Sequence, residues 1–161
     1  MFDLYLMTLN ITAGKETLDL PGLLVTTPPK RCDRSRSGDL LVARCSFSGT
    51  NPPPEEQVQK ILRETAGVYY DSRGSVTASL KIACEDLNGM LFDSNLKGAS
   101  RGIQRVATLT LAVIRRDALY LAQSGQTAIF LVSGDEVQAF NDPNPENRGL
   151  GISKNPLIQL H

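Results

Sequence analysis

The chain has 161 residues, 41% of them hydrophobic, and its 17 basic and 17 acidic side chains cancel. This length supports one substantial hydrophobic core, so we expect a single domain over residues 1–161. Zero net charge without a continuous basic run argues against nucleic acid as a partner. No apolar run approaches the ~20 residues that cross a membrane, so we expect a cytoplasmic protein.

The three cysteines, Cys32, Cys45 and Cys84, form no C-x-x-C pair, and His161 is the only histidine. A cluster of nitrogen and sulfur ligands for structural zinc is therefore not available. The same scarcity of histidine argues against a Ser/His/Asp triad. We expect the cysteines to be reduced thiols, mostly buried.

Apolar residues that alternate along the chain predict a first strand over Phe2–Thr12 and a second over Leu18–Thr27. The polar segment Lys30–Asp39 has no periodicity and predicts an exposed loop. The apolar run Leu40–Cys45 then predicts a central strand, which ends at the Pro-rich segment Ser46–Pro54.

Two helices are predicted next. The first follows Pro54 and ends near Tyr70, because apolar residues recur at helical spacing and two glutamates occupy the first turn, where the helix dipole favours negative charge. The second runs from about Ser75 to Asn95 and carries an apolar stripe wide enough to lie on a sheet. The stripe consists of Val76, Leu80, Ala83, Leu87, Met90 or Leu91, and Leu96. The residues expected to face solvent are Lys81, Glu85, Asp86 and Asn88.

The remainder of the chain predicts β-structure. Four consecutive strands are expected to form an antiparallel meander over residues 105–114, 118–123, 127–132 and 137–140. A loop rich in Pro, Gly and Asn follows, and one more strand begins at Pro156. Strands, then two helices, then strands predict an α+β layered sandwich rather than a wound βαβ sheet.

Three segments resemble the type-2C family of metal-dependent protein Ser/Thr phosphatases. Ala107–Phe140 (ATLTLAVIRRDALYLAQSGQTAIFLVSGDEVQAF) has the hydrophobic rhythm and the turns of the family's middle strands. Leu40–Gly49 (LLVARCSFSG) lies where the family has a strand that runs into Asp-Gly-x-Gly-Gly, and RGLGISKNPLIQL is similar to a later segment with a Leu-Gly pair. The resemblance implies a four-layer α-β-β-α sandwich of antiparallel sheets, truncated at the C-terminus relative to the family.

The motif positions that carry the family's chemistry are altered. The family holds two divalent ions between carboxylates, which activate a water molecule to attack the phosphoryl group. Here Cys45 falls on the metal-binding Asp, and a Gly-Asp-Ser turn becomes Gly125-Gln126-Thr127. The vestigial positions are Cys45, Ser46, Ser48, Gly49, Gly125 and Gln126, of which the two glycines at 49 and 125 keep the family residue. Neutral side chains do not supply the negative oxygens that hard cations need.

We therefore expect a catalytically inactive phosphatase-like domain, a pseudophosphatase without a cofactor that acts as a binding or regulatory module. The alternative is an active phosphatase in which Mg or Mn is held by a rearranged site that draws on Asp33, Asp39 or a neighbouring chain. Arg31, Arg34 and Arg36 are candidates for contacting a phosphate or another ligand, since a guanidinium can bind one with two hydrogen bonds. A solvated loop is the simpler interpretation of the same residues.

A third hypothesis is an amidohydrolase of the N-terminal nucleophile group, which also has a layered sandwich. Such enzymes need Thr, Ser or Cys as first residue, whereas this chain begins with Met1 and Phe2. The expected partner is another protein or the remainder of a longer chain. Because an exposed sheet edge tends to pair with another chain, we also expect a homodimer.

Overall fold

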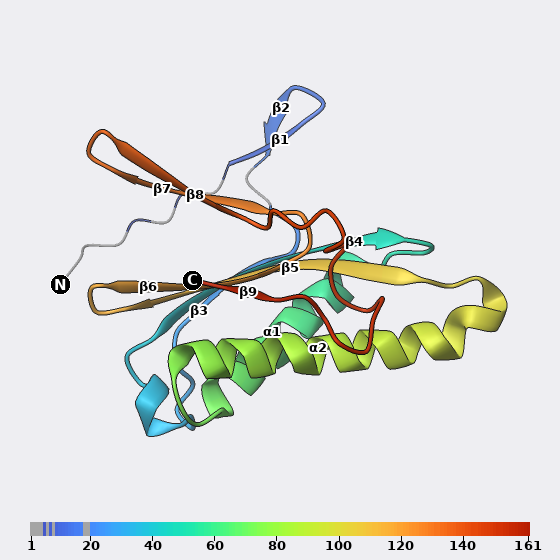
Figure 1. Ribbon diagram of the computed structural model, residues 1–161, viewed down its shortest axis with the longest axis horizontal. Coiled ribbons are helices and arrows are strands. Elements are labelled where there is room, and N and C mark those ends of the chain that lie inside the picture. Colours follow the sequence, from blue (N-terminus) through green and yellow to red (C-terminus); the bar gives the residue numbers. More distant parts are fainter. Residues whose placement is uncertain (1–4, 6, 8, 18–19) are drawn as a thin grey trace.

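The computed structural model describes residues 5, 7, 9–17 and 20–161, and its centre is a five-stranded antiparallel sheet (Figure 1). In spatial order its strands are β3 (Leu23–Thr26), β4 (Leu40–Gly49), β5 (Arg105–Arg115), β6 (Ala118–Ser124) and β9 (Gln159–Leu160). Helices α1 (Glu55–Asp71) and α2 (Val76–Gly98) cover the lower face in Figure 1, and two hairpins lie on the other side. The hairpins are β1 (Asn10–Thr12) with β2 (Lys15–Thr17), and β7 (Ala128–Ser133) with β8 (Glu136–Asn141). This is the predicted class, an α+β sandwich of antiparallel sheets and two helices.

The long central strands β4 and β5 determine which side chains face the helices. Their register runs from Leu40 opposite Ile114 to Gly49 opposite Arg105. Side chains alternate between the two faces of a strand, and the odd-numbered residues of both strands, such as Leu109, are the buried ones on the helical face. The central strand predicted to end at Cys45 therefore continues for four more residues, because β5 offers a partner along that whole length.

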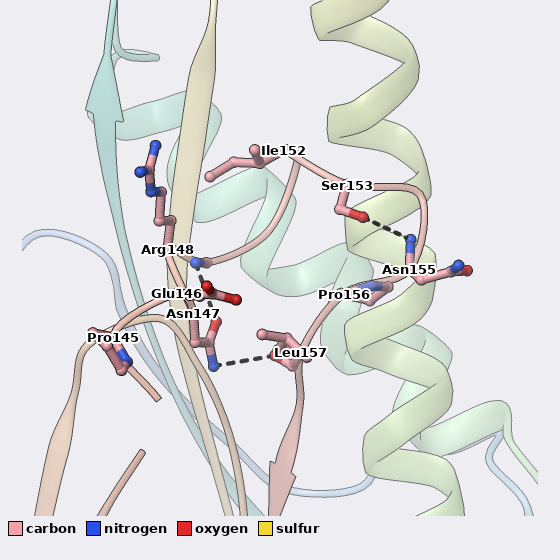
Figure 2. Close-up of a pocket in the computed structure, with 10 residues that line it drawn as sticks. Pro145, Glu146, Asn147, Arg148, Ile152, Ser153, Asn155, Pro156 and Leu157 are labelled. Carbon is pink, nitrogen blue, oxygen red and sulfur yellow. Dashed lines mark hydrogen bonds between the residues drawn. The ribbon is translucent and has the colours of Figure 1, made fainter. Parts of the chain in front are cut away.

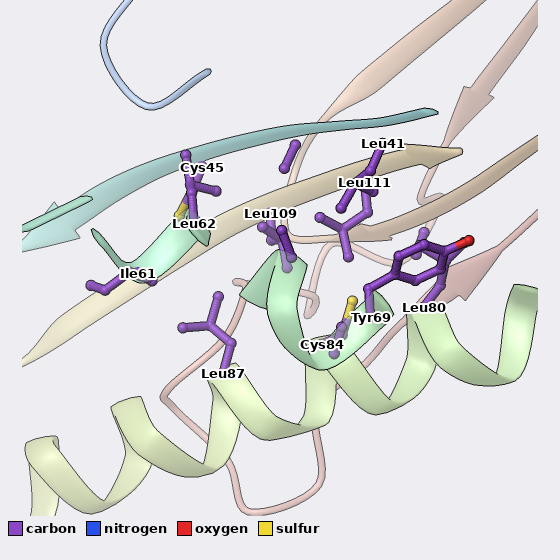
Figure 3. Close-up of a cluster of buried hydrophobic side chains, with 14 of the residues drawn as sticks. Leu41, Cys45, Ile61, Leu62, Tyr69, Leu80, Cys84, Leu87, Leu109 and Leu111 are labelled. Atoms are coloured by element: carbon purple, nitrogen blue, oxygen red, sulfur yellow. The ribbon is translucent and has the colours of Figure 1, made fainter. Parts of the chain in front are cut away.

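The helices bury their apolar sides on this face of the sheet, as Figure 3 shows. The fully buried side chains that meet there include Leu62, Tyr69, Leu80, Leu87, Leu109 and Leu111. Each buried leucine contributes about 2 kcal/mol through the hydrophobic effect, so the contact between helices and sheet is the main source of stability. Both helices were predicted to within a few residues of their ends.

Two details of α2 differ from the prediction. Asn88, expected to face solvent, is 2% exposed, whereas Leu96, expected in the buried stripe, is 60% exposed. Asn88 turns inward because its side chain donates to the Ser153 carbonyl and accepts from the Gly151 amide. Leu96 instead lines a hollow at the end of the helix, beside Ile103.

The predicted meander of four strands is wrong. β5 and β6 form a hairpin, but β6 pairs next with β9, and β7 and β8 form a separate two-stranded sheet. The chain leaves β6 through Gly125, whose φ of 91° lies in the left-handed region that glycine adopts at little cost. The Gln123 side chain of β6 then donates to the Phe140 carbonyl, which holds the base of the hairpin against the sheet.

The polar loop is more buried than its composition predicts. It contains a short 3-10 helix, Arg34–Arg36, and both Arg36 and Asp39 are buried, at 0% and 1% exposure. Composition predicts exposure because charged residues are rarely buried unless they are paired. Asp39 is paired with Arg115, which lies far along the sequence and could not be recognised as its partner from the loop alone.

The ends of the chain were predicted in part. Five of the eleven residues of the predicted strand Phe2–Thr12 lie outside the described residues, and its last three residues form β1. The predicted second strand is shorter, because only Leu23–Thr26 pairs with β4. The predicted last strand is β9, two residues long. Within the described part of the chain, no helix is long and apolar enough to cross a membrane.

Candidate functional site

The two segments that contain the vestigial positions lie at the same end of the sheet, on either side of β5. Cys45 is opposite Leu109 of β5, which is opposite Ser124 of β6. Strands in a sheet are about 4.8 Å apart, so Cys45 and the Gly125-Gln126 turn are separated by two strand spacings, roughly 10 Å. The sequence resemblance thus identified positions that the fold brings together.

The Cys45 side chain is packed in the core, although Cys45 also contributes to the lining of a cavity beside β4. Its side chain is on the helical face, 1% exposed, and belongs to the hydrophobic core with Leu62 (Figure 3). Burial raises the pKa of the Cys45 thiol to about 12, and the nearby charge of Arg44 only partly opposes that shift. The thiol is therefore neutral at physiological pH, neither a nucleophile nor a charged metal ligand.

The opposite face of β4 is polar near Cys45. Arg44, Ser46 and Ser48 project there, and the Arg44 guanidinium donates to the Cys45 carbonyl across 2.6 Å. A cavity of about 260 Å³ at the side of β4 is lined by residues of both faces, among them Arg44, Cys45, Ser46 and Phe47, and one carboxylate, that of Glu55, belongs to its lining. One carboxylate next to one guanidinium gives the cavity no net negative charge.

Gly49 keeps the family residue for a backbone reason. It ends β4 with a φ of 101°, and the Gln104 carbonyl lies where a side chain would project from its Cα. Any larger residue would therefore be strained and would clash. The turn geometry is therefore sufficient to explain this glycine, without any catalytic role.

The Gly125-Gln126 turn is bound to the loop that follows β8. The buried Asn147 side chain accepts from the amides of Gly125 and Gly149, and Gln126 donates to the carbonyls of Asn144 and Asn147. Figure 2 shows the Asn147 side chain turned toward Leu157, to whose carbonyl it donates across 3.3 Å. The amide of Gln126 thus has a structural role, because it ties the turn to the loop after β8.

The loop also encloses a cavity of about 410 Å³, whose rim includes Glu146 and Arg148 (Figure 2). Asp142 lies at the base of the loop. Burial alone would raise the pKa of the Asp142 carboxyl, but hydrogen bonds from Asn147 and from the Asn144 amide oppose it and lower that pKa below its usual value. Asp142 is therefore a charged carboxylate whose oxygens both already have donors.

The remaining candidates lie near the opposite end of β4. Cys45 is about 17 Å beyond Leu40 along an extended strand, whereas Asp33 and Asp39 precede that strand. Asp39 accepts from Arg115 and from the Tyr69 hydroxyl, and its carboxylate lies 3.7 Å from the Arg36 guanidinium. Asp33 accepts from the amide and hydroxyl of Ser35.

Arg31 and Arg34 are exposed on the same loop, beside a cavity of about 490 Å³ that also contains Asp71 and Arg73. Arg31 and Arg34 were predicted to contact a phosphate or another ligand. The fold does not place them near the vestigial positions. Over residues 5, 7, 9–17 and 20–161, no three His, Cys, Asp or Glu side chains are grouped so that they could hold a metal ion.

Sequence reasoning missed Arg44 and Asn147, which supply the charge and the hydrogen bonds around the vestigial positions. Arg44 projects from the face of β4 opposite to the Cys45 side chain, but its guanidinium curls back to the Cys45 carbonyl. For Asn147, the sequence signal that could have indicated a structural role is the neighbouring segment Gly149-Leu150-Gly151. This segment packs against β5, where Leu150 forms an isolated β-bridge with Ala107. A glycine-flanked apolar residue is typical of a backbone that approaches another closely.

Comparison with solved structures gives consistent matches at low sequence identity. The serine/threonine phosphatase Stp1 from Staphylococcus aureus superposes with a TM-score of 0.66 at 10% identity, over 96% of this chain and 68% of that one. The serine/threonine phosphatase of S. agalactiae gives 0.59 at 12% identity, over 87% and 73%. The fold is that of the bacterial type-2C phosphatases.

A stage II sporulation E family protein from Thermanaerovibrio acidaminovorans has the same type-2C fold, with a TM-score of 0.54 at 18% identity, over 86% of this chain and 71% of that one. No family model matches this chain, and no curated protein matches it significantly. At such identities the type-2C likeness is one of fold. The residues at the vestigial positions must therefore be judged by their own chemistry.

Proposed function

We propose that this chain is a catalytically inactive phosphatase-like domain that works as a binding or regulatory module in the cytoplasm. Its partner would be another protein or the remainder of a longer chain. The domain would need no Mg or Mn, because the positions where a type-2C enzyme has carboxylates are occupied by a thiol and an amide. The geometry of the sandwich is kept while its metal chemistry is lost.

The observation that carries this proposal is the orientation of Cys45. A metal ligand must present a negative atom to the ion, and hard cations such as Mg²⁺ require oxygen. The Cys45 thiol is neutral and packed among apolar side chains. On the open face, the nearest charged group of β4 is the guanidinium of Arg44, which would repel a cation.

The alternative, an active phosphatase with a rearranged site, has less support. Asp39 is one of the carboxylates that it would draw on, but that side chain is buried against Arg115 and Arg36. Asp33 is half-buried on the same loop and interacts with Arg73 at 3.8 Å. Neither carboxylate lies with a second one in a group that could hold a metal ion, within the described residues.

The proposal is tested by measuring p-nitrophenyl phosphate hydrolysis and calorimetric binding of Mn²⁺ and Mg²⁺, with an active type-2C phosphatase as positive control. We expect no hydrolysis above the metal-only blank and no saturable heat of metal binding. Hydrolysis that requires Mn²⁺ and is abolished by EDTA would overturn the proposal, and an Asp33→Asn variant would then show whether the rearranged site carries it.

A pair of variants tests the orientation of Cys45 directly. Cys45→Asp places a carboxylate in the apolar core, so we expect it to lower the free energy of unfolding by about 3 kcal/mol without creating Mn²⁺ binding. Ser46→Asp, the matched control on the exposed face, should leave stability nearly unchanged. A stable Cys45→Asp protein that binds Mn²⁺ would mean that this side chain faces a metal site.

A further inference from the structure

One end of the molecule carries a surplus of positive charge, although the chain as a whole is neutral. Three connections meet there, at the left in Figure 1: residues 30–39 between β3 and β4, 71–75 between α1 and α2, and 115–117 between β5 and β6. They contain seven basic and four acidic side chains, a net charge of +3. The residues outside the described ranges cannot cancel this charge, because their only acidic side chains are those of Asp3 and Asp19.

Hydrogen bonds join the three connections into one surface. The Asp33 amide donates to the Tyr70 carbonyl at the end of α1, across 2.9 Å. Arg36, a predicted phosphate contact, is buried instead, and its guanidinium donates to three carbonyls of the α1–α2 connection. Arg115 reaches from the end of β5 to the Ser35 carbonyl. The loop that carries the exposed arginines is therefore fixed from beneath by a buried one.

Three guanidinium groups line the cavity of about 490 Å³ on this surface. Arg31 and Arg34 come from the first connection and Arg73 from the second, and all three residues are exposed. Asp33 also lines the cavity, but its carboxylate accepts from the hydroxyl and amide of Ser35 and lies 3.8 Å from Arg73. The hydrogen bonds from Ser35 lower the pKa of the Asp33 carboxyl, so Asp33 is ionised and serves to hold the loop.

We propose that this cavity binds a phosphate monoester group directly, without a metal ion. Such a group carries nearly two negative charges and three terminal oxygens. A guanidinium donates two parallel hydrogen bonds to an anion of this kind, and guanidinium groups from two connections can reach different oxygens of one phosphate. A carboxylate has one charge and two oxygens, so it would use this arrangement less fully.

The proposed site is separate from the vestigial positions. The first connection precedes Leu40, whereas Cys45 lies about 17 Å further along β4. The inference therefore goes beyond the proposed function, and it holds whether or not the domain hydrolyses phosphate esters.

The carboxylate of Asp71 distinguishes an anion site from a cation site, because it too lines the cavity. Like charges repel, so we expect Asp71→Asn to strengthen phosphate binding about threefold. A cation held between Asp33 and Asp71 would instead be bound more weakly by this variant. Weaker binding of the phosphate probe by Asp71→Asn would overturn the proposal.

Calorimetric titration with glycerol 3-phosphate in metal-free buffer tests the site, with glutarate as the carboxylate control. We expect saturable binding of glycerol 3-phosphate that weakens as salt is added. Arg34→Gln should weaken it about tenfold, since it removes charge-assisted hydrogen bonds. Arg63→Gln, which changes an exposed arginine on α1 away from the cavity, should leave it unchanged. Equal effects of the two variants, or equally tight binding of glutarate, would refute the proposal.

Vesicles of phosphatidylcholine with and without phosphatidic acid show the source of the phosphate group. Binding that requires phosphatidic acid and is competed by glycerol 3-phosphate would support the site and identify a lipid headgroup as its ligand. Binding of glycerol 3-phosphate alone would support it with a soluble ester as ligand, and binding of neither would overturn it. The Mn²⁺-dependent p-nitrophenyl phosphate assay reports separately on the proposed function, so the two proposals can fail independently.

Discussion

At the residue scale, the feature with the largest energetic consequence is the ion-pair network in which the buried Asp39 carboxylate interacts with both Arg36 and Arg115. Asp39 is 1% exposed and compensates two guanidinium groups, while Arg36 also donates to the Ser79 hydroxyl and lies 5.3 Å from the Tyr69 ring centre. The Asp39 hydrogen bond raises the pKa of the Arg115 guanidinium above its already high value. Arg36 and Asp39 thereby attach the polar loop to the helices and to the end of β5.

Removing the central carboxylate should cost more than removing any surface charge of this chain. We expect Asp39→Asn to lower the free energy of unfolding by about 3 kcal/mol, because it leaves the Arg36 cation buried without compensation. Urea denaturation measures the change. Asp33→Asn on the same loop is the control, and its effect should be much smaller, since solvent screens the exposed Arg73 that it faces. Equal effects of the two substitutions would contradict a buried network.

At the element scale, α2 acts as an anchor for the loop after β8. Asn88 and Asn95 lie two turns apart on one side of the helix, and both reach the chain around Gly151. Asn95 also exchanges hydrogen bonds with the backbone of Arg105 at the start of β5. Two amide side chains thus hold together the helix, the central strand and the loop that supports the Gly125-Gln126 turn.

The anchor can be tested at Asn88. We expect Asn88→Ala to lower the free energy of unfolding by about 2 kcal/mol, because the buried Gly151 amide loses its acceptor. Hydrogen exchange should quicken at Gly151 and in the neighbouring loop, while the β4–β5 ladder stays protected. Asp86→Ala, an exposed change on the same helix, is the matched control. Unchanged exchange at Gly151 would show that the loop is held by other contacts.

Elements with strong local periodicity were predictable, and contacts between distant segments were not. Both helices and the strands β4 to β6 follow from apolar spacing, since each buries one continuous face. The break between β6 and β7 was missed because Gln123 and Gly125 look like ordinary turn-flanking residues until the Phe140 carbonyl is placed beside them. The vestigial positions are a prediction from resemblance alone, whereas the inward orientation of Cys45 follows from the register between β4 and β5.

At the scale of the whole molecule, the helices and the sheet are connected by polar as well as apolar contacts. The Tyr70 hydroxyl of α1 donates to the Thr26 carbonyl of β3 across 2.8 Å, and Gln59 donates to the Leu23 carbonyl. Tyr69 lies beside Tyr70, with ring centres 5.2 Å apart, and contacts Asp39. Unfolding of α1 would therefore expose the sheet and break its edge contacts, so the two layers should melt as one unit.

This cooperativity has a spectroscopic test, because the chain lacks tryptophan and its buried tyrosines lie at the boundary between the layers. We expect the helical far-UV circular dichroism and the near-UV tyrosine signal to change at the same denaturant concentration, since both helices and the sheet share one buried core. A Tyr69→Phe, Tyr70→Phe double variant, which should lose most of the near-UV signal, identifies its source. If the tyrosine signal were lost before the helical signal, the helices would keep their structure after leaving the sheet, and the chain would not be a single cooperative domain.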